Sequence, residues 1–194
     1  MKAEASRRDD WLLVDQDECW FSRFAQPAMH AFAGANDNVR LVQRTPAKDE
    51  PDKALACYGA VCQTTQERWL YFAEGQPNSD KTILFLQALL DTARAKAKQV
   101  LLVIWDRASW HKSHKVKQWV CQHNRQVRHN GGIRLLTYLL PSKSPWLNPM
   151  EPIWLHTKRK VAEPDGQLSV NVLKERLCAQ FHTTLDNATL KPSV

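Results

Sequence analysis

The sequence VLLVIWD at residues 100–106 consists of six apolar residues followed by one acid. An unbroken apolar run of this length is typical of a β-strand that is buried on both faces, because a strand with one wet face alternates polar and apolar side chains. Such a strand needs helices on both sides of its sheet. The stretch therefore predicts an α/β fold, and it places the carboxylate of Asp106 at the carboxyl end of the strand.

The segments around this strand have the patterns of further strands and helices. Strand patterns precede it at residues 11–14, 39–44, 55–63 and 69–73 and follow it at residues 133–140. Apolar residues at helical spacing predict four helices. One is capped by Ser79, one has its apolar period over residues 116–127 and ends at Asn130-Gly131-Gly132, one begins at Asn148 after a loop at 141–149, and one covers residues 169–185. Strands come first and then alternate with helices. We therefore expect a single α/β domain over residues 1–194, built on a mixed sheet flanked by helices.

Basic residues are concentrated in the second half of the chain. The net charge is +7 and the pI about 9.3, and residues 107–160 contain eleven Lys or Arg against one acid, Glu151. This surplus favours a polyanionic partner, although a solvated basic face would have the same composition.

The composition argues against membrane and secreted classes. No segment approaches the roughly 20 apolar residues of a membrane span, and the first residues lack the apolar core of a signal peptide. The five cysteines are odd in number and scattered, which predicts reduced and buried thiols. Cys57 and Cys62 do not have the spacing of a standard zinc ligand pair. We expect a cytoplasmic protein with no membrane partner.

Three acids stand at the ends of expected elements. Asp17 follows the apolar run of the first strand, Asp106 ends the strand at 100–105, and Glu151 lies in the first turn of the helix that begins at Asn148. In open α/β sheets, sites gather at the carboxyl ends of strands. Carboxylates that converge there repel one another unless a cation is present, and hard oxygen ligands select Mg²⁺ or Mn²⁺. Two such ions, roughly 4 Å apart, are suited to phosphodiester chemistry.

Each acid also has a structural explanation. Asp15 lies on the same strand face as Asp17 and is a rival for the ligand role. Asp106 can initiate a turn. Glu151 follows Asn148 by three residues, which is the spacing of a helix N-cap with its reciprocal glutamate.

The sequence around each acid resembles a motif of one family. Asp17 begins DECWF, Asp106 lies in IWDRASWH (residues 104–111), and Glu151 lies in SPWLNPMEPIW (residues 144–154), followed by Lys158 and Arg159. These segments resemble, in order, the three acidic motifs of the DDE-type transposases of the mariner superfamily, in particular the bacterial insertion-sequence 630 branch. The resemblance covers roughly residues 11–163, and the third motif is the most specific.

That resemblance implies a ribonuclease-H-like fold with Asp17, Asp106 and Glu151 as catalytic and metal-binding residues. It further implies two Mg²⁺ or Mn²⁺ ions, cleavage and transfer of DNA strands at transposon ends and target, a bacterial, nucleoid-associated location, and compatibility with a homodimer. Arg107 stands where the family commonly has Asn. Only about ten residues precede the first expected strand, so we expect the family's N-terminal helix-turn-helix region to be absent.

Residues near the acids are candidates for contact with nucleic acid through charge or base stacking. They are His111, Lys112, Lys143, Trp146, Lys158 and Arg159. Packing in the core or a solvated surface explains each of them as well, and Trp154 is expected in the core. Two other functions stay open: another two-metal nuclease of the same fold, such as an RNA–DNA hybrid hydrolase, and a truncated, non-catalytic remnant that binds DNA non-specifically.

Overall fold

The computed structural model describes residues 7–23, 54–73, 75–142, 144–161 and 168–190. The strand expected at residues 39–44 and the candidate contact residue Lys143 lie outside these described residues.

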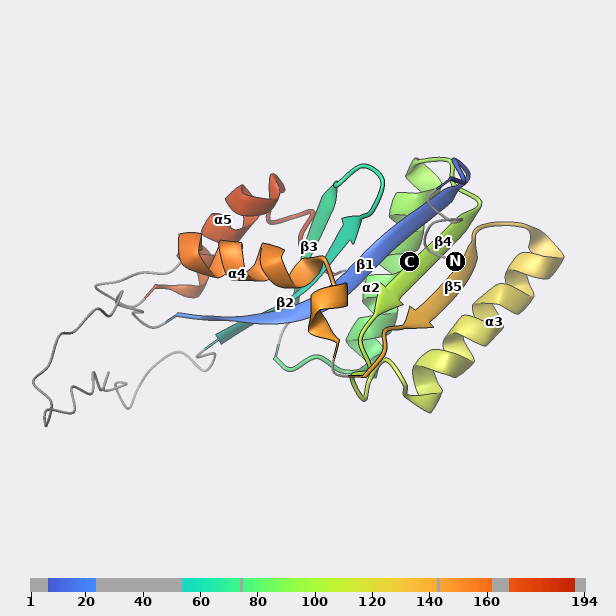
Figure 1. The fold of residues 1–194 in the computed structure, drawn as a ribbon, viewed down its shortest axis with the longest axis horizontal. Helices are drawn as coiled ribbons and strands as arrows, with labels where there is room; N and C mark the ends of the chain where they lie inside the picture. The colour runs from blue at the N-terminus through green and yellow to red at the C-terminus, as the bar shows by residue number, and fades with distance from the viewer. Residues whose placement is uncertain (1–6, 24–53, 74, 143, 162–167, 191–194) are drawn as a thin grey trace, which may run out of the picture.

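A mixed five-stranded sheet forms the centre of the structure, with the strand order β3-β2-β1-β4-β5 (Figure 1). β1 (Trp11–Ser22) pairs antiparallel with β2 (Ala54–Cys62), which pairs antiparallel with β3 (Arg68–Ala73). On its other side β1 pairs parallel with β4 (Val100–Trp105), and β4 pairs parallel with β5 (Arg134–Leu139). The prediction of a mixed α/β sheet is confirmed, and the apolar run at residues 100–105 is a buried strand in the interior of the sheet.

β1 is longer than its apolar run, which was expected to end at residue 14. Its pairing with β4 ends at Asp15, opposite Ile104, but its pairing with β2 continues to Ser22. Hydrogen bonds to β2 therefore keep the polar residues extended. Asp17 lies inside β1, two residues beyond the part that runs beside β4, and so still stands at the carboxyl edge of the parallel strands.

Helices cover both faces of the sheet, as Figure 1 shows. α2 (Ser79–Ala95) and α3 (His114–Asn130) pack on one face, and α4 (Met150–Val161) and α5 (Val170–Phe181) pack on the other, with the short 3-10 helix η1 (Pro145–Leu147) before α4. Within the described ranges, no helix combines the length and the apolar character that a membrane span requires.

The cap of α2 and the end of α5 differ from the prediction. The cap of α2 is Asn78, whose side chain accepts hydrogen bonds from the backbone N–H groups of Asp80 and Lys81, each at 3.0 Å. The α5 helix ends at Phe181 instead of residue 185, because His182 adopts a left-handed conformation with φ 51°. Local sequence favours Ser and Asn alike as caps, and which one is used depends on where the chain enters the helix.

Successive side chains of β1 alternate between the two layers. Leu12 and Val14 join the core under α2 and α3, whereas Leu13, Cys19 and Phe21 face the α4 side. Because the alternation has a period of two, Asp15 and Asp17 face α4, and Glu18 faces the α2 side.

The close packing of α4 on the sheet depends on Gly59 of β2, which pairs with Asp17 of β1. A Cβ atom at this position would lie 2.3 Å from Cζ2 of Trp154 and 2.5 Å from Cε of Met150. Trp154 is buried, as expected, between Phe21 and Phe181. The absence of a side chain at Gly59 thus lets the first turns of α4 rest directly on the sheet beside Asp17.

All five cysteines are free, as predicted, but only four are buried. Cys121 is exposed on α3. Cys57 and Cys62 belong to the cores on opposite faces of the sheet, so they do not form a zinc pair.

Candidate functional site

A cavity of about 370 Å³ lies at the carboxyl edge of β4 and brings the three predicted acids together. Asp17, Asp106 and Glu151 line it, along with residues of the loops that follow β4 and β5: Arg107, Ala108, Leu140, Pro141, Ser142, Ser144, Pro145 and Asn148. Each acid comes from a different element, and the first and last are far apart in the sequence. The pairing of the strands and the packing of α4 on the sheet bring these acids to one cavity.

Asp17 is the most buried of the three acids. Burial raises the pKa of its carboxyl to about 8, and the negative charges of Glu151, Glu18 and Asp106 act in the same direction. In the absence of a cation, its protonated form is therefore favoured near neutral pH. A divalent cation in the cavity would reverse this preference, because it stabilises the carboxylate form.

Asp106 is held in one orientation by two donors. Its Oδ1 accepts a hydrogen bond from the backbone N–H of Ala108 at 2.9 Å and another from Nδ1 of His111 at 2.8 Å. The bond from His111 is the main reason that the pKa of Asp106 lies below its usual value, although burial opposes it. The contact with Ala108 is the turn-forming bond that the structural explanation predicted, and it leaves Asp106 at the cavity.

Glu151 is exposed in the first turn of α4, next to an anchored asparagine. The side chain of Asn148 accepts a hydrogen bond from the N–H of Met150 and donates one to the carbonyl of Gln16 on β1, both at 3.1 Å. Asn148 thus ties the start of α4 to the residue before Asp17. The backbone N–H of Asn148 donates to the carbonyl of Pro145 at 2.8 Å, and among the hydrogen bonds of the described residues it does not donate to the Glu151 carboxylate, so the reciprocal half of a capping box is not formed there.

Asp15, the rival of Asp17, lies elsewhere. Its side chain is completely buried and accepts a hydrogen bond from Nε2 of Gln63. It does not line the cavity that contains Asp17.

His111 was expected at a phosphate, but its imidazole is completely buried. Nδ1 contacts Asp106 at 2.8 Å, Nε2 contacts Glu18 at 3.0 Å, and the ring stacks on Trp105 with centroids 4.5 Å apart. The indole N–H of Trp110 donates to the same oxygen of Glu18 at 3.1 Å. Both ring nitrogens of His111 thus contact carboxylates, and neither nitrogen is available to bind a phosphate.

The charge state of His111 follows from these contacts. Burial alone would lower its pKa, but the hydrogen bonds to Asp106 and Glu18 outweigh burial and raise the pKa to about 9. A protonated ring donates from both nitrogens, which matches the two contacts. Sequence reasoning missed Glu18 and Trp110, although each is adjacent to a residue of interest in the chain.

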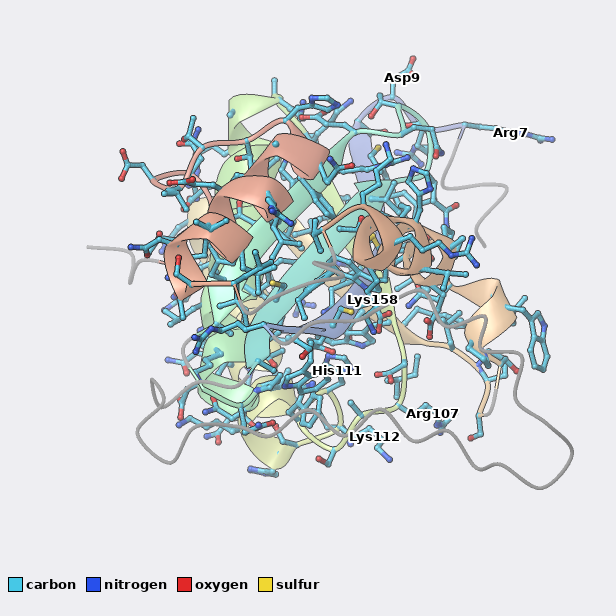
Figure 2. The ribbon with its side chains drawn as sticks, turned by 90° about the vertical axis from the view of Figure 1, so that its left-hand side faces the viewer. Arg7, Asp9, Arg107, His111, Lys112 and Lys158 are labelled. Carbon is cyan, nitrogen blue, oxygen red and sulfur yellow. The ribbon has the colours of Figure 1, made fainter. Side chains whose placement is uncertain are left out.

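The other described candidate contact residues are exposed, and none of them lines the cavity. Lys112, Lys158 and Arg159 are exposed, and Trp146 in η1 is 76% exposed. Arg107, which stands where the resembled family commonly has Asn, lines the cavity. Figure 2 shows Arg107 and Lys112 pointing outward at the edge of the molecule, whereas His111 lies further in.

Two groups of residues can be compared as metal ligands. Glu18, Asp106 and His111 offer ligand atoms within 4.8 Å of one another. However, Glu18 faces the α2 side of the sheet, and the separations of 2.8 and 3.0 Å are those of hydrogen bonds from His111. Asp17, Asp106 and Glu151 instead line an open cavity with carboxylate oxygens only, and this donor set suits Mg²⁺ or Mn²⁺.

The comparison with known families identifies the family of the chain. The chain belongs to the DDE superfamily endonuclease family, whose model matches residues 16–168. No curated protein sequence matches the chain significantly.

Solved structures with a similar fold include three of the Mos1 transposase. The paired-end complex with the left transposon end superposes with a TM-score of 0.60 at 14% identity, covering 91% of this chain and 51% of that one. The strand transfer complex has a TM-score of 0.59 at 13% identity, covering 96% and 52%. The mariner paired-end complex with Mn has a TM-score of 0.57 at 14% identity, covering 89% and 48%. The chain spans about half the length of these transposase chains, and its fold is ribonuclease-H-like, as predicted.

Proposed function

We propose that the chain is the catalytic domain of a transposase that cuts DNA at the ends of a mobile element and joins those ends to a target. The observation that carries the proposal is the meeting of Asp17, Asp106 and Glu151 at one cavity. Membership of the DDE superfamily endonuclease family supports phosphodiester chemistry at this cavity.

Asp17, Asp106 and Glu151 would hold two Mg²⁺ or Mn²⁺ ions through their carboxylate oxygens. Two such ions supply activation of a water or 3′-hydroxyl and stabilisation of the leaving oxygen. The raised pKa of Asp17 supports the role, because a buried carboxyl beside two others is ready to exchange its proton for a cation. The Mos1 structure described as a complex with Mn has a similar fold, which is consistent with this choice of metal.

His111 is a positioning residue in this proposal, in place of the phosphate contact expected for it. It donates to Asp106 from one nitrogen and is fixed by Glu18 at the other. The packing of its ring on Trp105 removes the remaining freedom of rotation. A ligand carboxylate held in this way does not have to be ordered when the ion binds, which favours binding.

Lys158 and Arg159 are exposed cations of α4 that suit contacts with the phosphates of a bound strand. Lys158 is seven residues after Glu151, so it lies on the same side of α4 at about 10 Å along the helix axis. Lys112 is a further exposed cation that points outward beside Arg107, and it suits contact with a phosphate. Trp146 has an exposed ring on which an unpaired base can stack.

The proposal extends to the finer identity of the protein. The segment SPWLNPMEPIW supports assignment to the insertion-sequence 630 branch, and hence a bacterial source, transposon ends and target DNA as partners, and a homodimer as the working assembly. A single catalytic domain over residues 1–194 and a location at the nucleoid follow from the same assignment.

The test is metal-dependent nicking and joining of a duplex by the wild type and by the variants Asp17→Asn, Asp106→Asn and Glu151→Gln. We expect each variant to lose the activity and to bind Mn²⁺ more weakly, while the matched control Asp15→Asn keeps its Mn²⁺ affinity. Hydrolysis of RNA–DNA hybrids without joined products would indicate the other two-metal nuclease. A wild type whose Mn²⁺ affinity is no greater than that of the three variants would indicate a non-catalytic remnant.

A further inference from the structure

Helix α3 has an unusual composition for a helix that packs on a sheet. Its 17 residues include no Asp or Glu, and Val116 is the only one that is fully buried. Trp119 and Val120 are partly buried against the core on its inner side, and polar contacts add to this packing. Nε2 of His123 contacts the carbonyl of Ile133 at 2.9 Å, and the Asn124 amide pairs with both the N–H and the C=O of Leu135 at 2.9 and 2.8 Å. These bonds fix the rotation of α3 about its axis.

With the rotation fixed, one set of side chains points away from the protein. We call this set the α3 stripe, and its members are His114, Lys117, Gln118, Cys121, Arg125 and Arg128. Apart from the neighbours Lys117 and Gln118, they recur at intervals of three or four residues, so they lie along one side of the helix. All six are exposed, and the first five line a shallow groove of about 440 Å³.

The positive charge of the α3 stripe is not neutralised locally. Lys115, on the side next to α2, forms an ion pair with Asp80. By contrast, within the described part of the chain Lys117, Arg125 and Arg128 have no acidic group within 4.0 Å. The stripe therefore presents three cations, Lys117, Arg125 and Arg128, along one side of a helix about 25 Å long.

The position of the α3 stripe relates it to the candidate active site. α3 connects the carboxyl end of β4, where Asp106 stands, to the amino end of β5, so it starts at the cavity edge and runs away from it (Figure 1). α4 contributes Glu151 to the cavity and carries Lys158 and Arg159 in its last turn. Two helices with clusters of basic residues thus lead away from the region of the acids.

We infer that the α3 stripe binds the phosphate backbone of duplex DNA that leads away from the candidate active site, an inference that rests on the proposed function. A row of cations along one side of a helix is complementary to the negatively charged phosphates of a DNA backbone. A membrane surface is a poor match, because none of the exposed large apolar side chains is on α3. Polar Gln118 and the imidazole of His114 add hydrogen-bonding groups of the kind that contact phosphates.

The test compares two triple variants of the full chain with the same change in net charge. The stripe variant is Lys117→Gln, Arg125→Gln, Arg128→Gln. The control is Arg68→Gln, Arg94→Gln, Lys96→Gln, which removes three exposed cations from the β3 and α2 surfaces. Binding of a blunt 25-base-pair duplex is measured at several salt concentrations. Because each lost phosphate contact lowers the salt slope of log K by about 0.9, we expect a decrease of about 2 to 3 for the stripe variant and little change for the control.

Cys121 gives a second readout, because it is the one exposed cysteine among the five and lies within the α3 stripe. We expect the duplex to slow alkylation of Cys121 several-fold in the wild type and in the control variant, and not in the stripe variant. Equal salt slopes for the two triple variants, no protection of Cys121 by the duplex, or equal protection by polyglutamate would overturn the inference. Failure of the proposed function is seen separately, since Asp106→Asn should lose nicking and keep both the salt slope and the protection of Cys121.

Discussion

Replacing Gly59 with alanine tests whether the close packing of α4 on the sheet determines the position of Glu151. The added Cβ would lie 2.3 Å from Cζ2 of Trp154, 2.4 Å from Cη2 of the same ring and 2.5 Å from Cε of Met150, whereas ordinary contact begins at 3.4 Å. Trp154 cannot turn aside, because Phe21 and Phe181 pack on it with ring centroids 5.8 and 5.5 Å away. The first turns of α4 must therefore withdraw from the sheet by more than 1 Å.

This displacement has a cost in stability and a cost at the site. Overpacking of a core by one methyl group lowers the free energy of unfolding by about 1–3 kcal/mol. Glu151 follows Met150 directly, so it moves with the turn while Asp17 stays in β1. A misplacement of about 1 Å in a catalytic arrangement lowers the rate by about 100-fold. We expect Gly59→Ala to lower metal-dependent nicking by about this factor and to weaken Mn²⁺ binding.

Thermal unfolding, Mn²⁺ titration and nicking are measured for Gly59→Ala, Trp154→Phe and the double variant. Phenylalanine lacks the two ring atoms that the new Cβ would meet, so the double variant should lose less than the sum of the single losses, with a coupling free energy of about 0.5–3 kcal/mol. Additive losses would show that the clash is relieved elsewhere. A Gly59→Ala protein that is destabilised but binds Mn²⁺ and nicks like the wild type would refute the link between Gly59 and Glu151.

The pKa of Asp17 is raised in the folded state, so the metal-free protein should lose stability as the pH rises from about 4 to about 8. Thermal unfolding in the presence of a chelator should show this loss of stability, and Asp17→Asn should reduce it. If the variant has the same pH profile as the wild type, the loss of stability belongs to other groups. His111→Ala should weaken Mn²⁺ binding by about 10- to 100-fold, and His111→Asn should bind Mn²⁺ better than His111→Ala because it keeps a hydrogen-bond donor near Asp106. Equal losses of affinity in the two variants would argue against positioning through that hydrogen bond. Asn78→Ala should cost about 1 kcal/mol of stability as the loss of a helix cap and Ser79→Ala should cost less, and thermal unfolding that ranks them in the opposite order would contradict the capping by Asn78.

The strongest local signals in the sequence predicted most of the fold correctly. The apolar run at residues 100–105 is a buried parallel strand, and the spacing of Leu86, Leu90 and Ala93 marks the buried side of α2. Such patterns are readable because strand and helix periods are properties of the backbone and hold wherever one face of the element is buried. The motif around Glu151 likewise predicted the start of α4, where Asn148 accepts a hydrogen bond from the first turn.

Only the tertiary structure decided the features that depend on partners distant in the chain. β1 extends past Val14 because β2 supplies hydrogen bonds for its polar residues, and nothing within the segment DQDECW indicates that support. His111 is buried because Glu18, on a strand 93 positions away in the sequence, meets its second nitrogen. Asp17 and Glu151 line one cavity because Gly59 admits Trp154 and Asn148 bonds to Gln16. Local sequence determines the conformational preference of each segment, whereas the burial, charge state and neighbours of a side chain follow from contacts that exist only once the segments have packed.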